Sequence, residues 1–420
     1  MREMKDSGIE WVGNIPATWK SIQIKNLFTI LSGATPTPDT DNWDGDVLWI
    51  TPADYKTKDK YVSGGKRNIS QQGFNTCSTS MIPKGSIIFS KRAPIGTVAI
   101  NTEVLCTNQG CLSCVSKADT CNDYYYYVMS VGTEHFELLG SGTTFKEISA
   151  NSFSNCKLPC PDKCEQEKIA SFLDERCSAF NCLISDIQSQ IEALEEYKRS
   201  VITEAVTKGI DPDVEMRDSG VQWIGMMPTH WDCQRGKYIL RYVQKPVRDD
   251  DGVITCFRDG EVTLRSNRRE EGFTMADKEI GYQGIDVGDL VVHGMDGFAG
   301  SIGISDSRGK ASPVLNVLDT EQNKRYIMYY LRSMAYNDVF VALATGIRVR
   351  SCDLRWNKLA ELLYSIPPIA EQQAIVEHID SVLERTNAII ADKKQQIKTI
   401  EEYKKSLIFE YVTGKKEVQA

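Results

Sequence analysis

Residues 165–209 of this 420-residue chain, EQEKIASFLDERCSAFNCLISDIQSQIEALEEYKRSVITEAVTKG, are the part of the sequence that most restricts its architecture. It contains no proline, and its only glycine is its last residue. Apolar side chains return at every seventh position, a period typical of a helix that packs along another helix over many turns. The stretch therefore predicts one helix of about 42 residues, about 63 Å long. Its expected packing residues are Leu173, Phe180, Ile187, Leu194 and Val201, flanked by Leu183, Ile184, Ile191 and Tyr197.

A second copy of this helix occurs near the end of the chain. Residues 371–415 read EQQAIVEHIDSVLERTNAIIADKKQQIKTIEEYKKSLIFEYVTGK, and 18 of the 45 aligned positions are identical. Thr386 and Lys393 fall on the packing face, where each would meet its own copy in a homodimer. We therefore predict an antiparallel coiled coil within one chain, with two separate helices, each on its own domain, as the alternative. The expected packing residues are Ile379, Leu383, Ile389, Ile390, Ile397, Ile400, Tyr403 and Leu407.

A shorter repeat accompanies each helix. MKDSGIEWVGNIPATW at 4–19 and MRDSGVQWIGMMPTHW at 216–231 share eight of sixteen positions, and the second copy begins where the first long helix ends. We call these sixteen residues the repeated phrase. The pseudo-twofold symmetry of an antiparallel pair predicts that the first copy meets the end of the second helix, which brings the two chain termini close together. The tryptophans of the phrase are expected to be packing anchors: Trp11, Trp19, Trp223 and Trp231.

A variable block lies between the phrase and the helix in each half, at about 20–157 and 233–365. Short β-rich runs such as GSIIFSKRAPIGTVAI alternate with glycine turns, a pattern typical of mixed α and β structure. We predict an α+β fold in which two α/β domains are separated by a pair of long antiparallel helices, with a pseudo-twofold internal repeat. The expected bounds are 1–160 and 211–366 for the two domains, and 161–210 and 367–420 for the two helices.

The composition predicts a soluble, cytoplasmic protein. The chain is 41% apolar and 25% charged, with a mean hydropathy of −0.32. No apolar run approaches the roughly 18 residues that a membrane span needs, and the first residues lack the apolar stretch of a signal peptide. The net charge is −8, but the excess acid lies within 162–232 and both variable blocks are near neutral. Local basic clusters therefore permit nucleic-acid binding without requiring it.

Ten of the thirteen cysteines fall within residues 77–182. Their odd number, without a secretion signal, favours reduced thiols over a disulfide framework. Cys106-x4-Cys111-x2-Cys114, with Cys121 as a fourth ligand, matches one iron–sulfur spacing. The second half of the chain has no counterpart to this cluster. We therefore interpret these cysteines as small hydrophobic residues in a strand-rich stretch rather than as metal ligands. The four histidines are scattered and form no metal-binding or catalytic spacing.

These features together resemble the specificity subunit of type I restriction–modification systems. The resemblance is carried by SGIEWVGNIPATW at 7–19, IPPIAEQQAI at 366–375 and EEYKKSLIFEYVTGK at 401–415, and it covers essentially the whole chain. The start of the first helix, CPDKCEQEKI at 160–169, departs slightly from the proline-rich segment that is usual there, which affects little except local packing.

The resemblance implies two target recognition domains, each reading one half of a split double-stranded DNA sequence, with the helices holding a fixed gap. It further implies that two methyltransferase subunits dock on the helices and that restriction/translocase subunits join them. S-adenosylmethionine, ATP and Mg²⁺ would act on these partners, while the specificity subunit itself is non-catalytic and binds no cofactor or metal. The residues agree, because GxxxxGKS/T, a helix-opening GxGxxG and Asn/Asp-Pro-Pro-Tyr/Phe are all absent.

DNA recognition of this kind uses cationic, amide and hydroxyl side chains on base edges and further cations on phosphates. The candidates in the first domain are Lys91, Arg92, Thr143, Thr144 and Lys146; those in the second are Arg265, Arg268, Arg269, Arg348 and Arg350. For any single one of them, a solvated surface charge is an equally good interpretation. Asn108 and Gln109 are weaker candidates, because their amides could simply hold a turn. The aromatic run at 124–127 is expected in the core and on a helix surface rather than as a base-stacking platform.

Because the two variable blocks differ in sequence, we predict a bipartite, non-palindromic DNA target. The alternative hypothesis is a coiled-coil scaffold that joins two protein-binding domains. The salt dependence of binding separates the two, since a DNA complex weakens steeply as salt rises.

Overall fold

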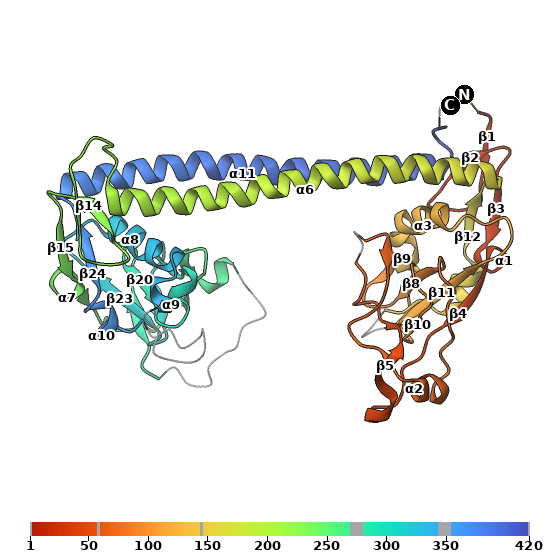
Figure 1. Cartoon of the computed structure of the whole chain (residues 1–420), viewed down its shortest axis with the longest axis horizontal. Coiled ribbons are helices and arrows are strands. Elements are labelled where there is room, and N and C mark those ends of the chain that lie inside the picture. Colours follow the sequence, from red (N-terminus) through yellow and green to blue (C-terminus); the bar gives the residue numbers. More distant parts are fainter. Residues whose placement is uncertain (1, 57–58, 143–145, 269–279, 343–353, 419–420) are drawn as a thin grey trace. The chain divides into compact units, whose positions relative to one another are not determined.

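The computed structural model describes residues 2–56, 59–142, 146–268, 280–342 and 354–418. The two predicted long helices are confirmed as α6, Lys163–Lys208, and α11, Ile369–Val412 (Figure 1). Each ends at a glycine with positive φ, Gly209 at 80° and Gly414 at 71°. A left-handed residue at this position ends a helix at little cost only when it carries no Cβ.

The chain divides into two compact units, and both long helices pass through both of them. The first unit contains residues 1–187 and 395–420, and the second contains residues 188–394. Within the first unit, Phe172 contacts Tyr411 and Phe180 contacts Tyr403, so the helices run antiparallel. Within the second unit, Gln190 bonds Lys393, while the end of α6 at 209 lies beside the start of α11 at 371. Each unit therefore joins one variable block to a part of both helices.

The first unit is built on a five-stranded sheet in the order β4-β11-β8-β9-β7, antiparallel except for the β7–β9 pair. A two-stranded ribbon, β3 with β12, closes the variable block. The elements are β1 Met4–Asp6, β2 Asn14–Pro16, β3 Lys20–Gln23, α1 Ile24–Leu27, β4 Phe28–Ser32, η1 Thr40–Asn42, β5 Trp43–Val47, β6 Trp49–Ile50, β7 Tyr61–Val62, α2 Gln71–Thr76, β8 Ile87–Lys91, β9 Ile95–Asn101, β10 Cys106–Thr107, β11 Cys111–Ser116, α3 Asn122–Val131, α4 Thr133–Leu138, α5 Ala150–Asn155 and β12 Lys157–Cys160.

The second unit repeats this plan with a four-stranded antiparallel sheet, β16-β23-β20-β21, and the closing ribbon β15 with β24. The elements are β13 Met216–Asp218, β14 Met226–Pro228, β15 Asp232–Arg235, α7 Gly236–Ile239, β16 Arg241–Tyr242, β17 Ile254–Cys256, β18 Val262–Leu264, η2 Arg265–Asn267, β19 Gln283–Ile285, β20 Leu290–His293, η3 Gly297–Ala299, β21 Ile302–Ile304, β22 Gly309–Ala311, β23 Leu315–Asp319, α8 Lys324–Tyr336, α9 Val339–Ala342, α10 Trp356–Leu359 and β24 Leu363–Ile366.

A buried helix attaches each variable block to the long helices. Tyr124 of α3 and Tyr326 of α8 are fully buried, and their hydroxyls donate to carbonyl oxygens at helix ends, Val412 O at 2.8 Å and Val206 O at 3.1 Å. The expectation that residues 124–127 belong to the core is confirmed. In each attachment, the buried ring removes apolar surface from water. The hydrogen bond of its hydroxyl fixes the orientation of the side chain.

The repeated phrase is a joint, as predicted. Trp19 Nε1 donates to Glu165 Oε2 at 2.8 Å, and Trp231 Nε1 donates to Glu371 Oε1 at 3.0 Å. The C-terminal end of each long helix reaches the same tryptophan, because a Cβ added at 414 would lie 3.0 Å from the Trp19 ring and one added at 209 would lie 3.3 Å from Trp231. The chain termini meet in an ion pair of 2.7 Å between residues 2 and 417.

The residue after each joint glutamate has an equally regular role. Gln166 Oε1 accepts from the backbone N–H of Cys121, just before α3, and Gln372 Oε1 accepts from that of Asn323, just before α8, both at 2.9 Å. These amides satisfy donors that would otherwise be left unpaired near a helix start. The Glu-Gln dipeptide that opens both copies of the long helix is therefore shared because it binds the phrase on one side and the buried helix on the other.

The predicted packing residues of the long helices fall into three groups. Leu173, Ile187 and Ile390 are buried, while Phe180, Leu194, Ile397 and Ile400 are half-buried. Tyr197 and Tyr403 are 51% and 56% exposed, so the seam does not enclose them, although Tyr403 still packs edge-on against Phe180. A residue at the margin of a seven-residue stripe turns toward solvent because a helix repeats every 3.6 residues rather than every 3.5.

Candidate nucleic-acid interface

The predicted cations of the first variable block lie where one end of the sheet is built from three neighbouring strands. Strand β11 pairs with β8 and with β4, so that the end of β8, the start of β11 and the segment after β4 gather at one edge. Backbone hydrogen bonds fix this edge: Lys91 N to Gly110 O at 2.9 Å, Ala34 N to Thr107 O at 3.0 Å and Ile148 N to Lys91 O at 3.0 Å. We call residues 33–35, 91–92, 107–110 and 146–148 the first sheet end.

Lys91 and Arg92 share one carboxylate at this edge. The Glu147 carboxylate forms ion pairs with Lys91 Nζ at 2.8 Å and with Arg92 Nη1 at 3.4 Å. The hydrogen bond from Lys91, the largest influence, lowers the pKa of Glu147. The Lys91 side chain is only 15% exposed. Two cations against one carboxylate leave a net positive charge, and Lys146, the next residue along, is exposed. The structure thus brings three of the predicted residues together, while Thr143 and Thr144 lie outside the described residues.

The second unit repeats the backbone of this edge with different side chains. Gly294 N donates to Val314 O at 2.7 Å, and Leu354 N donates to Gly294 O at 2.8 Å. Leu315 N donates to Ser312 O at 3.0 Å, which closes the turn before β23. These bonds correspond one for one to those of Lys91, Ile148 and Cys111 in the first unit. We call residues 293–296, 312–314 and 354 the second sheet end.

The side chains carried by the two edges are unlike. Gly294 and Met295 occupy the places of Lys91 and Arg92, and Pro313 occupies the place of Gln109. The Met295 side chain is 51% exposed. A lysine, an arginine and an amide in one unit therefore correspond to a glycine, an exposed thioether and a proline in the other. The framework is duplicated and the chemistry offered to a ligand differs.

Two of the predicted arginines of the second block, Arg265 and Arg268, lie beside the β17–β18 ribbon. Arg265 Nε donates to Thr255 Oγ1 at 3.2 Å. Arg268 pairs with Asp259 and Glu261, both at 2.8 Å, and stacks over the Phe257 ring. Arg269, Arg348 and Arg350 lie outside the described residues.

Arg258, which was not predicted from the sequence, is 62% exposed and pairs at 3.1 Å with Asp296 of the second sheet end. No doublet or cluster marks this arginine in the sequence. Its place becomes visible only when the turn between β17 and β18 is seen beside the end of β20, where His293 Nδ1 accepts from Asp296 N at 2.9 Å. Burial, the largest influence, lowers the pKa of His293, so that the ring stays a neutral acceptor for this bond at neutral pH.

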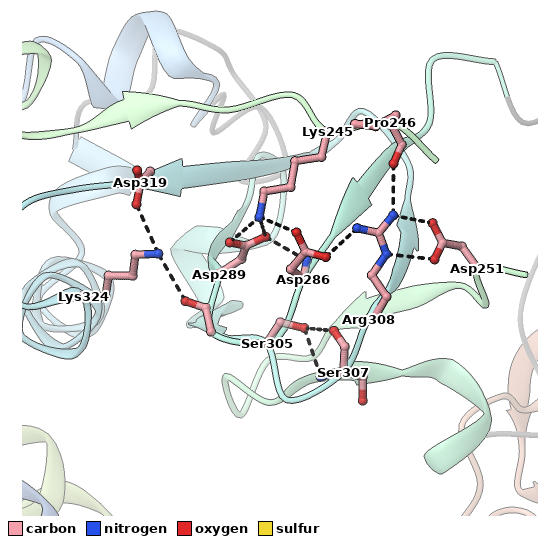
Figure 2. A network of polar contacts seen from close by, with 11 residues as sticks. Lys245, Pro246, Asp251, Asp286, Asp289, Ser305, Ser307, Arg308, Asp319 and Lys324 are labelled. Atoms are coloured by element: carbon pink, nitrogen blue, oxygen red, sulfur yellow. Dashed lines mark hydrogen bonds and ion pairs between the residues drawn. The ribbon is translucent and has the colours of Figure 1, made fainter. Parts of the chain in front are cut away.

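A polar network fixes the loops of the second block (Figure 2). Arg308 makes two bonds of 2.9 Å to the buried carboxylate of Asp251 and a third of 2.5 Å to Asp286. Lys245 Nζ lies on the other side of Asp286 at 2.8 Å and also bonds Asp289. Three carboxylates and two cations thereby join loops that lie far apart in the sequence.

This network predicts an acid-sensitive second unit. The hydrogen bonds from Lys245 and then Arg308 lower the pKa of Asp286 to about 2. A carboxyl whose pKa is lower in the folded chain stabilises the fold above its ordinary value near 3.8, and this contribution disappears as the pH falls through the folded value. We expect Asp286→Asn to cost about 1 kcal/mol at pH 6 and much less at pH 2, measured by hydrogen exchange of peptides from the second unit, because a chain of two units does not unfold in a single step. An equal cost at both pH values would contradict this assignment.

The three clustered cysteines do not converge. Cys106, Cys111 and Cys114 enter three different apolar clusters, with the last two on opposite faces of β11. Burial raises the pKa of Cys106 to about 11 and that of Cys111 to about 12, so both remain neutral thiols at neutral pH. Among the described residues, no group of three histidine, cysteine or acidic side chains could hold a metal ion. In the same part of the chain, no helix has the length and apolarity to cross a bilayer.

Comparison with known proteins gives a consistent result. Residues 16–193 match the family described as the type I restriction modification DNA specificity domain. The type I restriction enzyme MjaIX specificity subunit of Methanocaldococcus jannaschii is 36% identical over 189 residues, which are 44% of this chain and 43% of that protein. The MjaVIII specificity subunit of the same organism is 23% identical over 309 residues, 70% of this chain and 69% of that protein. The first match thus spans less than half of the relative's length.

A solved structure shares the fold. A chain from a study of the complex assembly and conformational transition of the type I R-M system superposes with a TM-score of 0.67 at 12% identity. The match covers 95% of this chain and 98% of the other.

Proposed function

We propose that the whole chain is a sequence-specific DNA reader whose units each recognise one half of a bipartite target, because residues 16–193 match the family described as the type I restriction modification DNA specificity domain. The duplicated sheet end carries the proposal. Because the two edges share their backbone hydrogen bonds but carry Lys91, Arg92 and Gln109 in one unit and Gly294, Met295 and Pro313 in the other, they would read different base sequences.

The chemistry that follows recognition belongs, in this proposal, to partner subunits. Two methyltransferase subunits would bind S-adenosylmethionine, and restriction/translocase subunits would bind ATP and Mg²⁺. The long helices offer each partner exposed apolar side chains at equivalent places: Leu183 and Tyr403 in the first unit, and Ile389 and Tyr197 in the second. Exposed aromatic and aliphatic side chains on an otherwise charged helix are typical of protein interfaces.

The direct test is to sequence methylated bases across a host genome with and without this chain and its own methyltransferase partner. We expect one modified motif with two unlike halves and an unspecified gap. A palindromic motif, or no motif that depends on this chain, would contradict the proposal. The alternative, a scaffold joining two protein-binding domains, predicts partner binding without the steep salt dependence of a DNA complex.

The exposed Lys146 makes a prediction for DNA affinity. If this side chain contacts phosphate, Lys146→Ala should weaken binding to all sequences alike and reduce the slope of log K against log salt by about 1. Lys84→Ala is the matched control, because Lys84 is an exposed lysine in the turn before β8, while Lys91 and Arg92 lie at the other end of that strand. Equal slopes for the Lys146 variant and the unaltered chain would remove Lys146 from the interface.

A further inference from the structure

Two adjacent amides at the first sheet end have different roles. The Asn108 side chain is turned back on its own loop, where Oδ1 accepts from Gly110 N at 2.9 Å and from Cys111 Sγ at 3.6 Å. Asn108 therefore holds the turn before β11. The neighbouring Gln109 side chain takes no part in that turn and is exposed. An exposed amide at the end of a rigid sheet, beside two cations, has the chemistry of a base-reading side chain.

The side chain of Gln109 is held by a residue from another strand. The hydroxyl of Thr35 donates to Gln109 Oε1. The segment that carries Thr35 is fixed, since Ala34 N donates to Thr107 O at 3.0 Å and a Cβ added at Gly33 would lie 2.1 Å from that same oxygen. Only glycine allows so close an approach of the two backbones. The contact between the hydroxyl and the amide therefore rests on two closely bonded backbone segments.

This contact fixes which end of the amide is offered to a ligand. The carbonyl oxygen is engaged by Thr35, and no described residue accepts a hydrogen bond from Nε2. The two N–H donors of Nε2 are therefore the groups presented outward. In the major groove, guanine offers N7 and O6 as acceptors, adenine offers N7 and thymine offers O4, whereas cytosine offers the donor N4. A donor held in this way favours a base with an acceptor edge over cytosine.

We propose that Gln109 reads one base of the first half-target by donating from Nε2 to an acceptor on its major-groove edge, with Thr35 as the positioning residue. This inference rests on the proposed function and names the reading group within it. The surroundings support a DNA ligand, because the two cations Lys91 and Arg92 share the single carboxylate of Glu147 and the exposed Lys146 lies at the same edge. The corresponding residue in the second unit is Pro313, which carries no side-chain donor, so this reading is confined to one half of the target.

The experiment replaces the donor by an acceptor of the same shape. Gln109→Glu, in the full chain with its own methyltransferase partner, should reduce methylation of the original motif about tenfold or more. One position of the first half-target should shift toward cytosine, because a carboxylate accepts from N4. The second half should stay unchanged. Gln72→Glu is the matched control, since Gln72 is an exposed amide on α2 that undergoes the same change of charge, and it should leave the motif intact.

A second pair of variants tests the positioning role without adding a charge. Thr35→Val keeps the shape of the side chain and removes the hydroxyl, so Gln109 is released; we expect discrimination to relax at the same single position. Thr35→Ser retains the donor and should restore the original motif. A merely structural role for Thr35 would change stability or the yield of complex without changing which base is read.

The outcomes separate this inference from the function on which it rests. If the unaltered chain directs methylation to a bipartite motif and Gln109→Glu leaves both motif and rate unchanged, Gln109 is not a reader and the inference fails alone. If the unaltered chain directs no bipartite motif, the proposed function itself fails. Should Gln109→Glu prevent folding, the Thr35 pair decides, because an unchanged motif in Thr35→Val would overturn the positioning role.

Discussion

Trp19→Ala is expected to lower the free energy of unfolding of the first unit by about 4 kcal/mol, because it empties a fully enclosed site. The Trp19 side chain is 1% exposed, donates to Glu165 at 2.8 Å and packs edge-on against Tyr124. Its loss leaves a cavity where the start of α6, the end of α11 and the phrase meet. Few single substitutions in a domain exceed this cost.

Hydrogen exchange of the full chain measures this effect locally, since a chain of two units does not unfold in a single step. Peptides from α3 and the first turns of α6 should lose protection in Trp19→Ala. Trp19→Phe keeps a six-membered aromatic ring and loses the pyrrole part of the indole with its N–H, so it leaves a smaller cavity and its cost should be clearly smaller. Trp231→Ala supplies the matched case, because it removes the equivalent bond to Glu371 and should expose peptides from α8 instead. Unchanged protection in both alanine variants would mean that the phrase does not hold the joint.

The long helices and the joint could be predicted because the sequence of each occurs twice in the chain. A seven-residue apolar period over a stretch without interior proline or glycine leaves few alternatives to a paired helix. The joint followed from symmetry, since the second phrase copy adjoins the end of the first helix along the chain. The sequence did not reveal its other partner. Glu165 and Glu371 bond the tryptophans across separations of 146 and 140 residues, and no local pattern marks such pairs.

The interface was less predictable for the same physical reason. A doublet such as Lys91-Arg92 is recognisable in the sequence as a basic cluster. The role of a turn residue depends instead on which side chains lie near it in the fold. Asn108 and Gln109 look equivalent in the string TNQG, and the structure separates them by the bond from Gly110 N to Asn108 and by the contact of Gln109 with Thr35, 74 residues away. The network around Arg308 was missed altogether, because its carboxylates at 251 and 286 lie 57 and 22 residues away. Contacts between loops depend on the sheet that brings the loops together.

Under the proposed function, replacing residues 20–157 by the corresponding block of a known specificity subunit is expected to change one half of the methylation motif completely and leave the other half unaltered. The structure explains why such an exchange is possible. The block begins at β3 and ends at β12, and these strands pair, with Lys157 opposite Gln23 and Cys160 opposite Lys20. Both ends of the block therefore lie in one short two-stranded ribbon, and an exchange cuts the chain at the two ends of that ribbon.

The reciprocal exchange provides the control and completes the argument. Residues 233–365 are closed by the equivalent ribbon, in which Cys233 lies opposite Ser365 and Arg235 lies opposite Leu363. Their replacement should alter only the half that the first exchange leaves intact. Genome-wide methylation mapping of both hybrids reads each half independently. If either exchange changed both halves, recognition would not be divided between the blocks, and the two unlike sheet ends would have to act as one composite surface rather than as separate readers.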